Sequence, residues 1–224
     1  MSVVRRDEQF PISVSVVISL IIIVIIASVM VISTRQITAA MVPDSSLVDG
    51  WHERIGDRIV SSGFFNLNQA VTYTYATDDV LFPASLLVQT KKSLVLPSET
   101  QLLNQAVSEH LPDLQNNYSI NTNTTMQGMR TLHTGHQTHY IVYQGVRNDY
   151  AQLDEIRCVI EVWNCGISKI SVICIGVAQI TNVSILSTDH STMNYLEHIL
   201  SDPIGTFGEQ YQQPDGLIYS IRCH

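Results

Sequence analysis

The sequence predicts an α+β protein, in which an N-terminal transmembrane helix precedes an antiparallel β-sheet domain flanked by helices. Three observations predict this class. Residues 12–33 form an uncharged apolar run. Several later segments alternate apolar and polar residues, as half-buried strands do, and others repeat apolar residues at helical spacing. Because helices and strands do not alternate strictly, a single antiparallel sheet is expected in place of parallel βαβ units.

The apolar run from Ile12 to Ser33 is the first predicted element. It carries no charged side chain, and as a helix it would extend about 33 Å, enough to cross a bilayer core of about 30 Å. The apolar part of a signal peptide is shorter, about 7–15 residues, so an uncleaved anchor is expected. Arg5 and Arg6 precede the run and only Arg35 follows it closely, so the positive-inside rule places the N-terminus in the cytoplasm.

This topology divides the chain into four parts and places the protein at the cell membrane with a single span. The expected parts are a cytoplasmic N-terminus (1–11), a transmembrane helix (12–33), a linker (34–49) and an extracytoplasmic α+β domain (50–224).

The composition agrees with an uncharged anchor joined to an acidic domain. Only 14% of the residues are charged, compared with about 25% in soluble domains. The formal charge is −8, and the charges that precede the apolar run cancel, so the acidic excess belongs to the outer domain. Such a domain lacks the basic face that DNA or RNA binding needs, and nucleic acid is therefore excluded as a partner.

The outer domain is expected to begin with a helix and two strands. Apolar residues recur at spacing four between residues 50 and 61, which favours a helix. Residues 71–75 alternate valine and tyrosine with threonine, which is typical of a strand, and the apolar run over 84–90 predicts a second one.

The clearest helix follows these strands. Ser98 can cap its N-terminus, and Gln101, three positions further on, completes a capping box. An apolar stripe continues at helical spacing as far as Leu111, and Pro112 is expected to end the helix. Residues 116–125 are polar and are expected to form turns.

The stretch over 129–178 predicts a three- or four-stranded antiparallel meander. Strands are expected on both sides of a tight turn at Thr134-Gly135. Two long apolar runs, 156–165 and 170–178, flank a second turn. Residues 191–200 then fit a final helix.

The predicted elements follow a particular order. An apolar strand (ASLLVQT) leads into an amphipathic helix (SETQLLNQAVSEHL), then a glycine- and aromatic-containing strand (GHQTHYIVYQG), two more strands (IRCVIEVWNC and ISVICIGVA) and a helix (NYLEHIL). Over Val71 to Leu200 this order resembles the PsbP/Mog1/DcrB-like fold of photosystem accessory proteins and prokaryotic surface lipoproteins. The first cysteine is Cys158, so the lipobox cysteine of the lipoprotein members is missing. The resemblance implies a binding or accessory module and no catalytic signature.

Three histidines, His133, His136 and His139, form an H-x2-H-x2-H pattern. In a strand–turn–strand segment, the first and last could face each other with His136 near the turn. Imidazole is a common ligand of transition metals, so a metal site is one interpretation. The alternative, which the hairpin pattern favours, is three histidines that face solvent.

The cysteines allow a disulfide. The alternation of the strand over 156–165 places Cys165 on one face and Cys158 on the other, and a turn after it would pair Cys174 near Glu161. A disulfide from Cys165 to Cys223 would attach the C-terminal segment to the sheet. The alternative is that the cysteines are buried free thiols.

The remaining sequence motifs give weaker indications of function. Asn117, Asn123 and Asn182 each begin an N-x-S/T triplet and permit glycosylation. The sequence has no C-x2-C pair, nucleophile elbow, P-loop or dinucleotide fingerprint, so neither catalysis nor a cofactor is expected.

The expected function is a non-catalytic binding or accessory module. It would contact the bilayer through residues 12–33 and have protein partners in a membrane complex. One alternative is a subunit of an archaeal type IV pilin-like filament, which has a short charged leader before an apolar helix and a mostly β head domain. A second alternative is a metal-binding surface protein that uses the histidine cluster.

Overall fold

The computed structural model describes residues 17–24, 37–47, 50–63, 68–78, 84–93, 95–147, 154–179 and 216–224. The chain divides into two compact units, Met1–Gln36 and Ile37–His224. In the first unit the described residues, 17–24, are helical and exposed.

The predicted transmembrane helix over 12–33 is corrected by this structure. Within the described residues, no helix has the length and apolar character needed to cross a membrane. The predicted single-pass location at the cell membrane, with its signal-anchor, is contradicted by the same finding.

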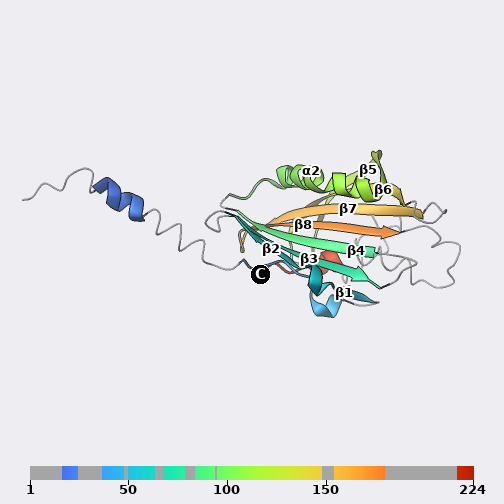
Figure 1. The fold of residues 1–224 in the computed structure, drawn as a ribbon, viewed down its shortest axis with the longest axis horizontal. Helices are drawn as coiled ribbons and strands as arrows, with labels where there is room; N and C mark the ends of the chain where they lie inside the picture. Colours follow the sequence, from blue (N-terminus) through green and yellow to red (C-terminus); the bar gives the residue numbers. More distant parts are fainter. Residues whose placement is uncertain are drawn as a thin grey trace, which may run out of the picture. The chain divides into compact units, whose positions relative to one another are not determined.

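The second unit is organised by an antiparallel sheet (Figure 1). Its described strands are β1 (Trp51–Glu53), β2 (Ile59–Ser62), β3 (Gln69–Thr77), β4 (Ala84–Lys92), β5 (Ser119–Thr131), β6 (Gln137–Arg147), β7 (Asp154–Cys165) and β8 (Ile170–Gln179). They lie in the order β1-β3-β4-β8-β7-β6-β5, and β2 also pairs with β3. Every pair is antiparallel.

The helices in the described residues are few. Apart from the helical residues 17–24, they are the long α2 (Glu99–Asn117), the short α5 (Leu217–Ser220), and the 3-10 turns η1 (Asp44–Ser46) and η2 (Ile55–Asp57). The predicted α+β class, a sheet flanked by helices behind a transmembrane helix, is therefore wrong. The described fold is mostly antiparallel β-sheet.

The helix expected over 50–61 explains part of this error. The segment forms β1, η2 and β2, and the two strands pair with β3 at the edge of the sheet. Ile55 and Ile59, whose spacing suggested a helix, are 78% and 62% exposed. The repeat at spacing four therefore does not mark a buried helical face. The helix expected over 191–200 lies outside the described residues.

The two strands before α2 and the strands of the meander are where the sequence predicted them. Residues 71–75 and 84–90 lie within β3 and β4, and the meander is β5 to β8. The polar stretch over 116–125, however, is mostly strand β5, which has a bulge between Asn121 and Thr125.

Helix α2 covers one face of the sheet. Ser98 and Gln101 form the predicted capping box. Leu102, Ala106 and Leu114 are buried against apolar side chains of β6, β7 and β8. Pro112 lies inside the helix and does not end it, and the further turn brings Leu114 onto the sheet.

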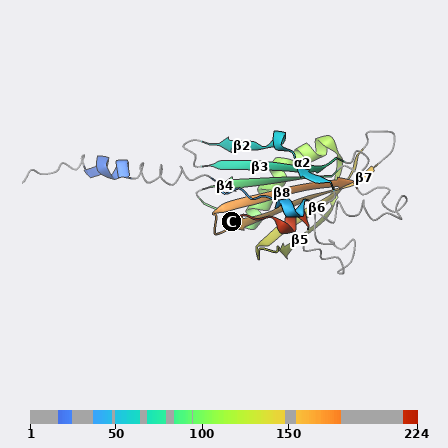
Figure 2. The same cartoon turned by 90° about the horizontal axis from the view of Figure 1, so that it is seen from below.

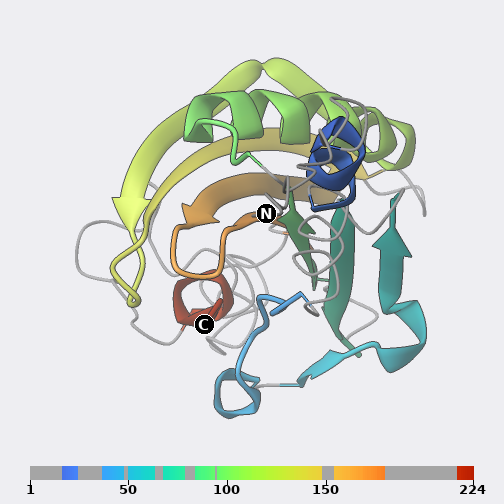
Figure 3. The same cartoon turned by 90° about the vertical axis from the view of Figure 1, so that its left-hand side faces the viewer.

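Two segments that are distant in the sequence cover the opposite face. We call Ile37–Leu47 and Gly216–His224 together the strap. They join through an isolated bridge in which Met41 and Arg222 exchange two backbone hydrogen bonds of 3.1 Å. Figure 2 views this face with α2 behind the sheet. Figure 3 shows the curved sheet with α5 inside the curve and α2 outside it.

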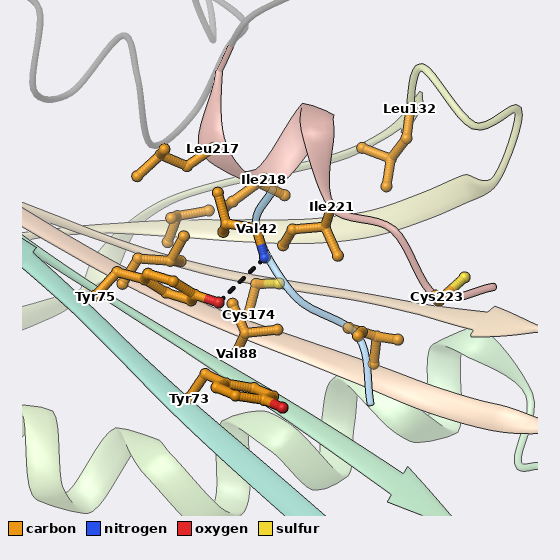
Figure 4. Packing of buried hydrophobic residues seen from close by; sticks show 14 of the residues in the cluster. Val42, Tyr73, Tyr75, Val88, Leu132, Cys174, Leu217, Ile218, Ile221 and Cys223 are labelled. Atoms are coloured by element: carbon orange, nitrogen blue, oxygen red, sulfur yellow. Dashed lines mark hydrogen bonds between the residues drawn. The ribbon is translucent and has the colours of Figure 1, made fainter. Parts of the chain in front are cut away.

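The strap is attached by apolar packing and by hydrogen bonds, of which the bond between Val42 and Tyr75 is drawn in Figure 4. Its buried residues Ala40, Val42, Leu217, Ile218 and Ile221 belong to a core cluster with side chains of β3, β4, β7 and β8. The backbone N–H of Ala40 donates to Thr90 Oγ1 at 2.8 Å. The backbone N–H of Val42 donates to the hydroxyl of Tyr75 at 3.2 Å.

Candidate metal centre

Four metal-ligating side chains meet where the strap reaches the meander. They are His136 from the β5–β6 turn, Cys165 at the end of β7, and Cys223 with His224 from the strap. One ligand atom of each lies within 4.8 Å of those of the other three. We call these four residues the Cys2His2 cluster.

The tight turn between β5 and β6 positions His136. Gly135 has a φ of +81°, which glycine adopts at little cost. Its N–H donates to the carbonyl of Leu132 at 2.9 Å, and the N–H of Leu132 donates to the carbonyl of His136 at 2.9 Å. These bonds fix the backbone on both sides of the histidine.

The end of β7 positions Cys165. Cys165 pairs with Ile170 at the last register position before the β7–β8 turn. Ser168 in that turn donates a short hydrogen bond from its hydroxyl to the carbonyl of Cys223. The turn therefore holds the strap directly beside the first sulfur.

Apolar residues of the strap position the other two ligands. Leu217, Ile218 and Ile221 are 0% exposed, so α5 is anchored in the core just before the chain reaches Cys223. Cys223 is itself 1% exposed, whereas His224 is exposed. The cluster thus has two buried sulfurs and one side open to solvent.

The distances within the cluster match the edges of a coordination tetrahedron. Cys223 Sγ lies 3.2 Å from His136 Nε2 and 3.5 Å from His224 Nδ1. Cys165 Sγ lies 3.4 Å from His224 Nδ1. A tetrahedral Zn²⁺ with Zn–S of about 2.3 Å and Zn–N of about 2.0–2.1 Å separates sulfur from nitrogen by about 3.6 Å. These three sulfur–nitrogen distances are therefore close to those between ligands of one ion, and all four ligand atoms lie within 4.8 Å of one another.

The two neighbouring thiols influence each other's pKa in opposite directions. Burial alone would raise the pKa of Cys165, but hydrogen bonds with Cys223, Ser168 and His224 outweigh it, and the pKa is lowered. Burial and the neighbouring Cys165 raise the pKa of Cys223 to about 12. A bound cation would offset the charge of two neighbouring thiolates.

The surroundings suit a charged sulfur and a neutral imidazole. Burial lowers the pKa of His136, and His224 acts in the same direction, so His136 is held in the neutral form that binds metals. Nε1 of Trp163 is buried and makes no hydrogen bond. Trp163 nevertheless lies near enough to Cys223 to lower its pKa against the larger effect of burial, and its N–H is a donor that a thiolate could use.

The structure separates the three histidines of the H-x2-H-x2-H pattern. Only His136 belongs to the Cys2His2 cluster. The ring of His133 lies 6.0 Å from that of Tyr219. His139 pairs with Met129 and Val162 in the sheet.

The cysteines and histidines combine in a way that the sequence did not predict. His136 was assigned to a histidine site, and Cys165 with Cys223 to a disulfide, whereas the structure brings all three together with His224. The signal that could have found His224 is the adjacent Cys-His pair. Cys165 and Cys223 are free thiols here, and their disulfide stays a prediction.

The proposed glycosylation positions are exposed where they are described. Asn117 ends α2 and donates from its side chain to the carbonyl of Asp113 at 2.9 Å, and Asn123 lies in β5. Asn182 lies outside the described residues. Glycosylation also stays a prediction.

A buried ion pair lies on the same face of β7 as Cys165. Glu161 is 1% exposed and accepts from Arg130 Nε at 2.8 Å, from Arg130 Nη2 at 2.6 Å and from Thr138 Oγ1 at 2.6 Å. Arg130 supplies the opposite charge and Thr138 a further hydrogen bond, so we interpret this group as a structural ion pair. Glu161 pairs with Cys174, as the sequence predicted.

A cleft of about 550 Å³ lies near the N-terminal half of α2, between that helix and the ends of β3 and β4. Lys91 and Lys92 are among its lining residues, and Lys91 forms an ion pair with Glu109 at 2.5 Å. None of the Cys2His2 residues lines this cleft, so the cleft and the cluster are separate features.

Comparisons with known proteins assign no family to this architecture or to the cluster, and the resemblance to the PsbP/Mog1/DcrB-like fold stays a prediction. No protein-family model, no curated protein and no solved structure matches the chain.

Proposed function

We propose that this chain is a metal-binding protein whose Cys2His2 cluster holds one Zn²⁺ in a structural role. The observation that carries the proposal is the convergence of four ligand atoms within 4.8 Å of one another. An accessory role with protein partners stays a prediction beside it.

The donor set favours zinc among the common metals. Two thiolates and two imidazoles at tetrahedral spacing are a typical zinc ligand set, whereas Mg²⁺ and Ca²⁺ take oxygen ligands. Cys165 and Cys223 are almost completely buried, which keeps water away from the sulfur ligands.

A structural role fits better than a catalytic one. A catalytic zinc keeps one coordination position for water or substrate, and four protein ligands leave none. The ligands come from the β5–β6 turn, the end of β7 and the strap. A bound ion would therefore fasten the strap to the sheet and stabilise the folded state by its binding free energy.

Metal analysis of ligand variants tests this proposal. The full chain is loaded with Zn²⁺, desalted, and analysed for zinc per chain by plasma mass spectrometry. We expect one zinc per chain in the native protein, and a large loss in His136→Ala and Cys165→Ala. His133→Ala and His139→Ala are matched controls from the same hairpin and should keep the zinc.

Two outcomes would overturn the proposal. Equal zinc in all four variants would mean that the ion is adventitious. A loss in His133→Ala and His139→Ala with none in Cys165→Ala would transfer the site to the histidine pattern. Circular dichroism of each variant shows whether a loss of zinc reflects the ligand or the fold.

A second candidate, a pilin-like filament subunit, is favoured by one observation. The described part of Ile37–His224 is mostly antiparallel β-sheet, the head architecture that this candidate requires. Mass spectrometry of the N-terminus in the native host tests it. Removal of a short charged leader would support it, and an intact Met1 or Ser2 terminus would contradict it.

A further inference from the structure

We infer that the Cys2His2 cluster is a redox switch, in which Cys165 and Cys223 either bind Zn²⁺ as thiolates or join as a disulfide and release it. This inference rests on the proposed zinc site and adds its regulation. The oxidant it requires is hydrogen peroxide.

The two sulfurs lie close together within the cluster. They are no more than 4.8 Å apart, and both belong to the ligand set. A disulfide consumes both sulfurs and leaves only two imidazoles, which bind zinc far more weakly than the complete set. Zinc binding and the disulfide therefore exclude each other.

The reaction balances with one peroxide per cluster. One thiolate attacks a peroxide oxygen, and the O–O bond breaks to give a sulfenic acid and water after proton uptake. The second thiolate attacks the sulfenic sulfur, the S–S bond forms, and hydroxide leaves as water. The two thiolates lose two electrons, the peroxide gains them, and Zn²⁺ leaves without a change of oxidation state.

The strap should stay in place in both states. The zinc joins Cys223 to Cys165 through an ion, and the disulfide joins the same two residues covalently. Independent of both, Leu217, Ile218 and Ile221 are fully buried. Oxidation would therefore release the metal without detaching the strap.

Access to the sulfurs is from the histidine side. Cys165 and Cys223 are 0% and 1% exposed, while His224 is exposed and His136 is half-buried. Displacement of His224 would open the route by which peroxide enters and zinc leaves.

The other two cysteines provide the contrast. Cys158 belongs to the apolar core under α2, and Cys174 pairs with Glu161 in the middle of β8. Neither belongs to the cluster, and both are 0% exposed. They are expected to stay reduced under the same conditions.

The experiment uses the zinc-loaded full chain and one equivalent of hydrogen peroxide. Released zinc is followed with a chromogenic chelator, and peptide mass spectrometry without reduction maps the disulfide. We expect release of nearly all the zinc, a disulfide between Cys165 and Cys223, and recovery of zinc binding after a phosphine reductant and fresh Zn²⁺ are added.

Variants separate the metal from the disulfide. His136→Ala should lose zinc yet still form the Cys165–Cys223 disulfide with peroxide. Cys158→Ala is the matched control and should release zinc as the native protein does. Thermal unfolding should rank the zinc-loaded and the oxidised forms close together, with the reduced metal-free form clearly below both.

The outcomes distinguish this inference from the proposed function. Zinc that binds but stays bound after peroxide, with four free thiols, would overturn the switch and leave the zinc site standing. A disulfide through Cys158 or Cys174 would also overturn it. If the oxidised form unfolds at the same temperature as the reduced metal-free form, the prediction that the strap stays in place after oxidation would be wrong. A native chain that binds no zinc at all would overturn the proposed function and this inference with it.

Discussion

Helix α2 and the strap cover opposite faces of one sheet by different means. The α2 face is covered by one continuous helix whose apolar stripe packs on apolar strands. The strap face is covered by two segments from opposite ends of the unit, and it also contains the buried ion pair and the Cys2His2 cluster. A helix is stabilised along its length by its own hydrogen bonds, whereas short segments need attachments to the rest of the fold.

This difference places the chemistry of the molecule on the strap face. Glu161, Trp163 and Cys165 alternate along β7 with residues that face α2. The side under the helix needs only apolar residues. The side under the strap has polar groups that must be paired, neutralised or liganded.

Breaking the buried ion pair between Arg130 and Glu161 should cause the largest loss of stability. Arg130→Met would leave the carboxylate of Glu161 buried without its cation, and we expect a loss of about 3–5 kcal/mol in the free energy of unfolding. Urea denaturation measures it. Replacing both Arg130 and Glu161 by methionine should recover most of that loss, because the uncompensated charge is removed. A single variant within about 0.5 kcal/mol of the native protein would show that the pair is not important for the strap face.

Matched core truncations compare the two coverings directly. Leu102 under α2 and Ile221 in the strap are 1% and 0% exposed, so Leu102→Ala and Ile221→Ala should each cost about 2–5 kcal/mol. Only Ile221→Ala should also weaken zinc binding, because Cys223 follows it by two residues. Equal zinc affinities, measured by competition with a chelator, would contradict the link between strap packing and the metal site.

Alkaline pH should lower the free energy of unfolding through one buried titratable group on each face. Burial raises the pKa of Cys158, on the α2 face, to about 12, and that of Tyr75, on the strap face, to about 12. The folded state holds these protons more tightly than the unfolded state. Stability is therefore complete below the unfolded values of about 9 and about 10, and it falls by roughly 1.4 kcal/mol per pH unit and group as pH rises toward 12.

Chemical denaturation between pH 8 and pH 11 separates the two groups. Cys158→Ala should make the loss of stability above pH 9 shallower, and Tyr75→Phe should do so only above pH 10. If neither variant changes the slope, burial does not hold these protons in the folded state.

Removing the capping box of α2 should cause the smallest loss of stability. Ser98→Ala removes the acceptor for the N–H of Gln101 and should cost about 1 kcal/mol. Zinc content should not change, because the cap lies on the α2 side. A loss of zinc in Ser98→Ala would show that the two coverings are coupled.

Local patterns made helix α2 and much of the sheet predictable from the sequence. The capping box, the strands over 71–75 and 84–90 and the pairing of Glu161 with Cys174 all depend on spacing within short stretches. One prediction was wrong because the residues that formed the helical pattern, Ile55 and Ile59, are exposed. Another was wrong because Pro112 was expected to end the helix, whereas the packing of the following turn continues it.

The strap face could not be predicted in the same way. The contact of His136 with Cys223 spans 87 positions, and that of Ala40 with Thr90 spans 50. No periodicity joins residues so far apart. The sequence therefore singled out three of the four cluster residues but assigned them to two unrelated sites.

X-ray absorption at the zinc edge of the loaded full chain tests the central claim most directly. The Cys2His2 cluster predicts two sulfur neighbours at about 2.3 Å and two nitrogen neighbours at about 2.0–2.1 Å. A shell of oxygen and nitrogen alone, with no sulfur, would contradict the account.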